Sequence, residues 1–458
     1  GLGDVYKRQQ LDQNSIASSR ELLNRFVSFY SNASYTYDDK YVLSGSIRWD
    51  RSNLWGTNSK YQNKPLWSVG GSWNIYKEKF FQADFVDMLK LRASYGIGGN
   101  IGRNTAPYLI ASYYDSSLVD GMAGSVNTPP NKDIRWEKTT TVNVGVDFAL
   151  FRHRLSGTIE YYNKYSVDLL AAINGSPTQG FGYTTLMTNN GKMVNRGVEI
   201  TLSGEIIRQK DFSWNASLLY AFNRNKVKHI SVQPSLWDSR ISMPTSYPMV
   251  GKPLYGIYAY KWAGLNENGD PQVYDAENNV TSGPARDYHA LVYCGTTVPI
   301  HNASLTNVLR YKGFEFSAML ILDAGHKLRS SNIPSINMSN GRITSTAKGI
   351  VDRWTQPGDV TDVPRLLFSN DTENFNTHRT ELYRYSDLFV YDASNIRLSN
   401  ISLAYRVPAH WCKKISLSGA RLQFNVENVA TFAFDSKANY DLGGKVKPNY
   451  VWGLYLNF

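Results

Sequence analysis

Residue types that perform catalysis or bind metals are present in this chain, but their spacing matches no known site. The seven histidines are scattered, and none pairs with another in the HxxxH or HExxH spacing of zinc sites. Neither a Walker A motif nor a GxSxG nucleophile turn occurs. Asp359 and Asp362 lie close together but fit loop turns better than acid–base catalysis. We therefore predict no catalytic residue, no metal site, no cofactor and no enzyme activity.

Two other features come near to chemical motifs. The run Gly96-Ile-Gly98-Gly99-Asn-Ile101-Gly102 approaches a dinucleotide fingerprint, but Ile101 occupies the place of the third glycine. A loop also follows the run where the fingerprint requires a helix, so a turn out of a strand is the better interpretation. Cys294 and Cys412 lie far apart and form no CxxC, which excludes a disulfide framework and a cysteine-only zinc site.

Aromatic side chains are the remaining candidates for binding, since the chain has 31 Tyr, 11 Trp and 19 Phe. Those in the long predicted loops are suited to stacking on sugar rings or packing against a peptide. The alternative is that they pack loop against loop. The candidate substrate contacts are Trp55, Tyr108, Tyr113, Tyr114, Tyr183 and Trp237.

The last nine residues alternate between two faces. Tyr450, Trp452, Leu454, Leu456 and Phe458 are apolar or amphipathic, and smaller or more polar residues lie between them. Nine or so residues with a period of two suffice for a tilted strand to cross a bilayer. We interpret these five residues as the outward face of a closing barrel strand.

The same alternation recurs from Arg25 onward, for example in Tyr41–Asp50, Leu89–Ile97 and Phe212–Asn223. Short turns (such as Asp38–Lys40 and Asn266–Pro271) alternate with long connections. One apolar face, one polar face and unequal connections are typical of an outer-membrane barrel. This pattern predicts an all-β, transmembrane antiparallel β-barrel with about 15 strands. The stretch from His378 to Tyr391 is predicted as a polar loop.

Composition narrows the class of protein. The chain has 458 residues, a net charge of +11, 42% hydrophobic residues and a mean hydropathy of −0.38. Apolar runs reach only about five residues, which excludes a helical membrane protein, whose helices need roughly 20. The basic residues form no block of five or six, so we predict no nucleic-acid partner.

The chain divides into two parts. Residues 1–24 are an uncertain leader and loop remnant, in which 1–10 resemble nothing around them and suggest an artefact. They contain no secretory signal. Residues 25–458 form the partial barrel with long extracellular loops.

The order and spacing of eleven segments resemble the SusC/RagA family of TonB-dependent outer-membrane transporters over nearly all of 25–458. These segments are Asp38–Leu43, Ile47–Ser52, Leu89–Gly96, Gly99–Asn100, Ile134–Lys138, Asn143–Phe148, Asn195–Ile200, Gly264–Pro271, Tyr311–Phe314, Arg353–Asp359 and Ile396–Leu403.

The resemblance implies a barrel of about 22 strands with an N-terminal plug. Its partners would be outer-membrane lipid, a SusD-like surface lipoprotein and TonB. It would import oligosaccharides or peptides across the outer membrane of a Gram-negative bacterium. The 15 strands would be the C-terminal ones, with the plug and TonB box missing here. Cys294 would lie outside and Cys412 at the periplasmic rim, unpaired, and the final aromatic resembles an assembly signal.

Other interpretations stay open. A passive porin or a surface adhesin could use a similar barrel, and a secreted polysaccharide-binding β-protein could also contain alternating strands.

Overall fold

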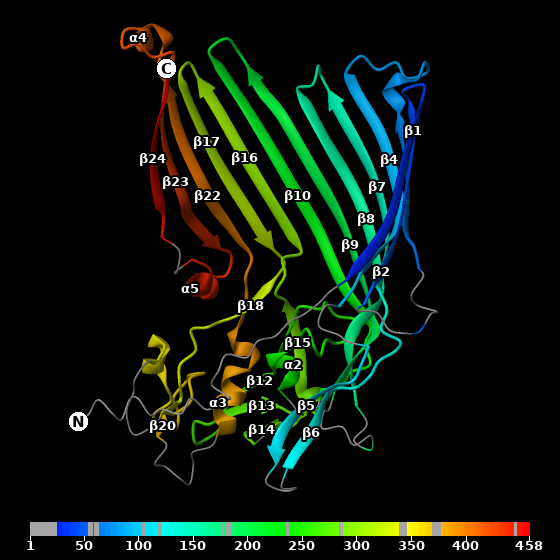
Figure 1. Ribbon diagram of the computed structural model, residues 1–458. Helices are drawn as coiled ribbons and strands as arrows, with labels where there is room; N and C mark the ends of the chain where they lie inside the picture. Colours follow the sequence, from blue (N-terminus) through cyan, green and yellow to red (C-terminus); the bar gives the residue numbers. More distant parts are fainter. Residues whose placement is uncertain are drawn as a thin grey trace, which may run out of the picture.

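One curved antiparallel sheet dominates the structure. The computed structural model describes residues 25–53, 58, 64–102, 107–116, 121–175, 178, 185–234, 238–283, 285, 287–338, 346–368, 377–443 and 447–458. Within these residues, the sheet has thirteen strands, each hydrogen-bonded to the next (Figure 1). In order they are β1 (Phe26–Tyr37), β2 (Tyr41–Ser52), β3 (Leu66–Asn74), β4 (Val86–Asn100), β7 (Glu137–Leu150), β8 (Leu155–Asn174), β9 (Thr185–Arg208), β10 (Phe212–His229), β16 (His301–Tyr311), β17 (Phe314–Ala324), β22 (Asn395–Arg406), β23 (Gly419–Ala433) and β24 (Asn449–Asn457). We call this sheet the wall.

The two faces of the wall follow the alternation in the sequence. Leu403, Phe424 and Trp452 are register partners across β22, β23 and β24, on the outer face. The ring centroids of Phe424 and Trp452 lie 4.2 Å apart, and Trp452 is 78% exposed. Large apolar side chains exposed in rows of this kind suit contact with lipid rather than water. The all-β prediction is therefore confirmed.

Short turns join the strands at one end of the wall. Asp38 and Asp39 link β1 to β2 with φ angles of 51° and 52°. Such left-handed angles define the hairpin turns whose twist matches that of paired strands, and Asp tolerates them better than most residues. The long connections leave the opposite end of the wall (Figure 1).

The predicted number of strands is corrected by the structure. The turn Asn266–Pro271 joins β12 (Trp262–Leu265) to β13 (Pro271–Tyr274), which pair in a separate small sheet with β14 (Val280–Thr281). Two strands assigned to the barrel therefore belong to a single long connection between β10 and β16. The described wall has thirteen strands rather than about fifteen. A period of two reveals a strand but not the sheet that it joins.

Two long connections fold together into what we call the loop unit, the described parts of 238–300 and 326–394. It lies below the wall in Figure 1. Its other paired strands are β11 (Gly256–Tyr260) with β15 (Leu291–Thr296), β18 (Lys327–Arg329) with β21 (Val390–Asp392), and β19 (Asn337–Met338) with β20 (Leu367–Phe368). Its helices are α2 (Ser239–Ser242), α3 (Thr377–Arg384) and the 3₁₀ helices η5 (Tyr288–Ala290), η6 (Lys348–Asp352) and η7 (Asp387–Phe389).

The loop unit has its own hydrophobic core. Tyr258, Tyr260 and Leu382 are almost completely buried in one cluster, and Tyr383 is buried beside Phe389 in a second. Leu382 and Tyr383 belong to α3, so the prediction of a polar loop from His378 to Tyr391 was wrong. The helix is short and largely polar, so it depends on tertiary contacts such as packing against the buried tyrosines.

The remaining described elements are peripheral. They are the hairpin of β5 (Ile110–Ser116) and β6 (Gly121–Thr128), the helices α4 (Ala409–Lys413) and α5 (Asn439–Leu442), and the 3₁₀ helices η3 (Ile75–Lys77) and η8 (Ser436–Ala438). None of the helices found in the described ranges has the length and hydrophobicity needed to span a bilayer.

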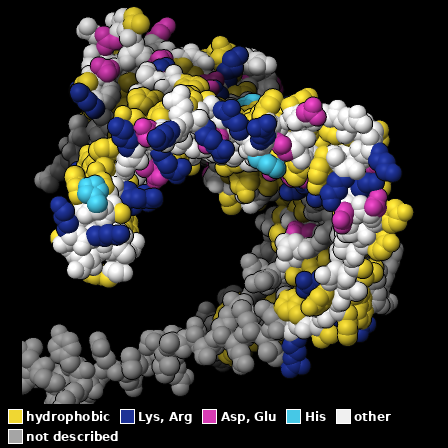
Figure 2. Space-filling model, turned by 90° about the horizontal axis from the view of Figure 1, so that it is seen from above, with side chains coloured by type: hydrophobic (Ala, Val, Ile, Leu, Met, Phe, Trp, Pro, Cys, Tyr) yellow, Lys and Arg dark blue, Asp and Glu magenta, His cyan; other side chains and the backbone are white. Residues whose placement is uncertain are grey.

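The wall ends in two strands that do not pair with each other. β1 pairs with β2, and β24 pairs with β23 at the other end of the sheet. Figure 2 looks along the wall from the short-turn end and shows it curving around an open space. The described sheet is therefore an open barrel wall.

Candidate functional site

The concave inner face of the wall is lined by polar side chains. The Ser46 and Ser68 hydroxyl oxygens lie 2.7 Å apart across β2 and β3, and Gln423 donates from β23 to Ser402 on β22 at 3.3 Å. These residues alternate with the outer apolar residues along the same strands. The inner face therefore offers a solute more hydrogen-bonding groups than the mostly apolar outer face does.

Charged side chains on this face form ion pairs between nearby strands. Arg92 contacts both Asp147 and Glu160, and Thr158 donates to Asp147 at 2.9 Å. Nearer the short turns, Glu315 accepts from Arg310 at 2.7 Å and from Arg421 at 3.2 Å.

A third group lies at the loop end of the wall. There, Asp323 accepts from Asn302 at 2.7 Å and from Arg397 at 2.9 Å. Charges paired in this way stiffen the wall and leave a polar surface without a catalytic arrangement.

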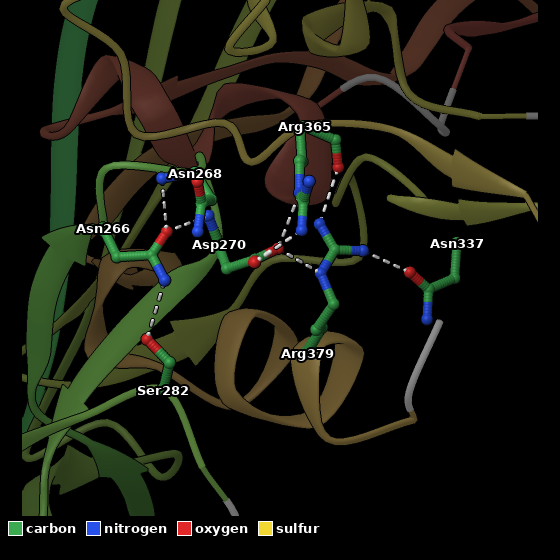
Figure 3. Close-up of polar contacts among 7 residues, drawn as sticks. All are labelled: Asn266, Asn268, Asp270, Ser282, Asn337, Arg365 and Arg379. Carbon is green, nitrogen blue, oxygen red and sulfur yellow. Dashed lines mark hydrogen bonds and ion pairs between the residues drawn. The ribbon is translucent and has the colours of Figure 1, made fainter. Parts of the chain in front are cut away.

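The loop unit is held by a carboxylate between two arginines. Asp270 accepts from Arg365 at 3.0 and 2.8 Å, one bond to each carboxylate oxygen. Arg379, from α3, donates to Asp270 at 2.7 Å and to the Arg365 carbonyl at 2.7 Å (Figure 3). We call Asp270, Arg365, Arg379 and Asn337, which accepts from Arg379, the Asp270 clamp.

The turn before β13 places the Asp270 carboxylate. Asn266 accepts from the backbone N–H groups of Asn268 at 3.0 Å and of Asp270 at 2.9 Å (Figure 3). Asn and Asp favour such turns because their side chains can accept from the backbone two and more residues ahead. The clamp went unpredicted because Arg365 and Arg379 are distant in sequence. The only signal was the turn motif of Gly264–Pro271.

The structure places three of the six predicted substrate contacts. Tyr108, Tyr113 and Tyr114 are 63%, 72% and 53% exposed. The hairpin of β5 and β6, which contains Tyr113 and Tyr114, lies at the loop end of the molecule (Figure 1). Tyr113 and Tyr114 are consecutive in β5, so they point to opposite faces of the hairpin. The three do not form one platform. The other three candidates, Trp55, Tyr183 and Trp237, lie outside the described residues, as do residues 1–24.

The terminal strand is exposed on both faces. Tyr450, Trp452, Leu454, Leu456 and Phe458 are all more than 40% exposed, but Tyr455, on the other face of β24, is 56% exposed as well. The outward orientation of these five residues therefore stays a prediction. Recognition of this strand as an assembly signal stays a prediction.

The two cysteines are free, as predicted. Burial raises the pKa of the Cys294 thiol to about 11. The thiol is therefore protonated at neutral pH and a poor nucleophile. Among the residues that the structure describes, no group of three His, Cys, Asp or Glu side chains could hold a metal ion.

A family model, curated proteins and solved structures all match this chain to TonB-dependent receptors or transporters. The family model described as "TonB dependent receptor-like, beta-barrel" matches residues 3–429. The chain is 27% identical over 456 residues to TonB-dependent receptor P3 of Formosa agariphila, covering 93% of this chain and 43% of that protein. It is 25% identical over 427 residues to TonB-dependent receptor SusC of Bacteroides thetaiotaomicron, covering 88% and 40%.

The chain spans about two fifths of the length of the curated relatives that it matches. The solved "Structure of the RagAB peptide transporter" superposes with a TM-score of 0.75 at 23% identity, over 99% of this chain and 51% of that one. This likeness establishes the fold of the wall and the loop unit.

Proposed function

The chain belongs to the TonB dependent receptor-like β-barrel family, and from that membership we propose that it forms the barrel wall and outer loops of a nutrient importer. The importer would be of the SusC/RagA type, in the outer membrane of a Gram-negative bacterium. The observation that carries the proposal is the wall itself, with an apolar outer face and a polar, ion-paired inner face.

The complete transporter would contain more than this chain. We propose that the wall is the C-terminal part of a barrel of about 22 strands. A plug and a TonB box would be contributed by sequence not contained here. Support comes from the unpaired edges of β1 and β24 and from the partial coverage of the relatives.

A SusD-like lipoprotein is the proposed partner at the loop end. The loop unit supports this because it has its own core and clamp and so presents a fixed surface there. Co-purification of such a lipoprotein with the tagged, complete gene product tests the partnership. Its absence from membranes that contain both proteins would count against it.

The proposed substrates are large nutrients, oligosaccharides or peptides. The test is uptake by cells that express the complete gene, with and without TonB. We expect uptake to stop when TonB is removed, since transport would be energised through it. Undiminished uptake would instead indicate a passive porin. Recovery of the protein in a soluble fraction, rather than in detergent extracts of the outer membrane, would favour the interpretation as a secreted protein.

A further inference from the structure

A cavity of about 330 Å³ lies at the loop end of β8, β9 and β10. Pockets that hold small ligands start at roughly this size. Its lining is mostly aliphatic, and the polar residues are few. The lining includes Leu169, Ala171, Met187, Gly191, Met193 and Val227. We call it the aliphatic pocket.

The floor of the aliphatic pocket is a β-bulge. Pairing between β8 and β9 shifts register on both sides of Leu169, and Asp168 has a left-handed φ of 57°. Arg135 holds the Asp168 carboxylate at 2.7 Å, and the Asn189 side chain donates to the Asp168 carbonyl at 2.7 Å. Bulges re-aim side chains next to functional sites, and this one is held in place by specific contacts.

Gly191 keeps the floor open. A Cβ atom at this position would lie 3.0 Å from the Leu169 Cβ and 3.6 Å from the Ala171 Cβ. A larger residue would therefore fill the space between these two side chains. The absence of a side chain at Gly191 leaves Leu169 and Ala171 open to the pocket.

A segment of the loop unit covers the aliphatic pocket. Gly251 donates to the Val227 carbonyl at 2.8 Å, and Val227 donates to the Lys252 carbonyl at 2.9 Å. The Leu254 N–H donates to the Asn225 side chain at 2.7 Å. The cover is therefore fixed to β10 by three hydrogen bonds, which makes the pocket a formed feature of the fold.

The aliphatic pocket adjoins the inner face of the wall. Met193 pairs with Ser166 on β8 and with Val227 on β10, so these three residues share one face of the sheet. Asn195 and Glu199 follow Met193 at even intervals on β9 and lie on that same face. A solute that moves along the polar inner face would pass this pocket.

The chemistry of the lining indicates the ligand. Among the described lining residues none is Phe, Tyr or Trp, whereas sugar rings are commonly bound against such aromatic faces and by dense hydrogen bonding. Met187 and Met193 are flexible and adapt to side chains of different shape. Lys192 and Glu137 provide opposite charges beside the apolar surface, as a peptide with polar backbone and termini would require.

From this geometry we propose that the aliphatic pocket binds a leucine-like side chain of a peptide substrate. The proposal rests on the proposed function, and it selects peptides over oligosaccharides. Variation among peptides would be tolerated at other positions because the pocket contacts one side chain only.

The first test fills the pocket. Ala171→Phe is introduced into the complete gene product, with Ala318→Phe as a matched control on the outer face of β17. The probes are a Gly/Ser/Asn decapeptide with one leucine, the same peptide with serine at that position, maltohexaose and decanoate. We expect Ala171→Phe to weaken binding of the leucine peptide about tenfold or more, as loss of one buried leucine should. The control variant should bind as the unaltered protein does.

The second test enlarges the pocket. It tests the proposed leucine site even if the Ala171→Phe variant does not fold. Leu169→Ala should shift preference from the leucine peptide to a phenylalanine peptide by about tenfold. No change in preference, or binding of maltohexaose or decanoate in place of the leucine peptide, overturns the proposal. TonB-dependent uptake that survives alongside such a result would leave the proposed function intact.

Discussion

Asp270 joins parts of the chain that lie 95 and 109 residues away from it, at Arg365 and Arg379. The Arg379 side chain is only 2% exposed, so this carboxylate compensates a buried positive charge. We expect Asp270→Asn to lower the free energy of unfolding of the loop unit by about 3 kcal/mol, since it removes the negative charge that pairs with two arginines, one of them buried. Hydrogen exchange of α3 and β13 measures the effect.

Asp275 offers a matched control in the next turn. It accepts from the backbone N–H groups of Glu277 and Asn279 within its own turn, and backbone hydrogen bonds of this kind lower its pKa. Asp275→Asn should leave the exchange of α3 unchanged. Equal loss of protection in both variants would mean that the Asp270 clamp has no special role.

The lowered pKa of Asp392 predicts that the stability of the loop unit depends on pH. Burial raises its pKa, but hydrogen bonds from Ser394 and the Lys327 ammonium outweigh burial and lower the pKa to about 2. A carboxyl with a depressed folded pKa stabilises the fold above its unfolded pKa of about 3.9, and the stabilisation is lost as pH falls through the folded value.

Because the Asp392 side chain is 39% exposed, solvent screening limits the contribution to roughly 1 kcal/mol. We expect the loop unit to lose this stability between about pH 4 and pH 2, and Asp392→Asn to remove that part of the slope. Denaturant titrations of both proteins across this range provide the measurement. If stability falls with pH equally steeply in the variant, Asp392 is not the source of this pH dependence.

At the level of elements, the two faces of one strand should respond differently to charge. Leu403 faces outward from β22 at 46% exposure, and Ser402 faces inward. Leu403 lies three residues from the short-turn end of β22, towards the edge of the bilayer, so Leu403→Lys should cost about 1–2 kcal/mol, whereas Ser402→Lys should cost less than about 1 kcal/mol. Unfolding of the complete gene product in lipid vesicles compares the two. Equal costs would contradict the assignment of the faces.

The elements differ in how far the sequence predicts them. Long alternating segments such as β2, β4 and β23 were predicted because their period alone identifies both faces. β12 and β13 alternate too, but they pair outside the wall, which local periodicity cannot reveal. α3 was missed because its burial depends on distant segments: Leu382 packs with Tyr258 and Tyr260 of β11, and Tyr383 packs with Ile336 and Phe389.

The candidate site was predicted less well than the fold. Tyr113 and Tyr114 were chosen by type, and their adjacency in β5 sends them to opposite faces. Asp270, Arg379 and the bulge at Asp168 depend on contacts between distant segments, so no local pattern marks them.

At the level of the whole molecule, the open edges of the wall predict self-association. β1 and β24 each leave one side of backbone groups unpaired by the described sheet, and such edges recruit other strands, most strongly in lipid or detergent. The chain expressed alone should therefore form oligomers in detergent, while the complete gene product should not. Light scattering after size exclusion distinguishes them. If the chain alone is monomeric and its migration on a gel changes with heating, β1 and β24 pair with each other without additional strands.

The Asp270 clamp also implies an order in which the parts of the molecule fold. β16 and β17 lie in the sequence between Asp270 and Arg379, so this pair of wall strands separates the two halves of the loop unit. Closing so long a stretch of chain carries an entropic cost that later contacts must offset, and it slows folding. The wall should therefore mature first and the loop unit last. During that interval a newly assembled molecule would present unfolded loops, and a protease added early would cut where a protease added late would not.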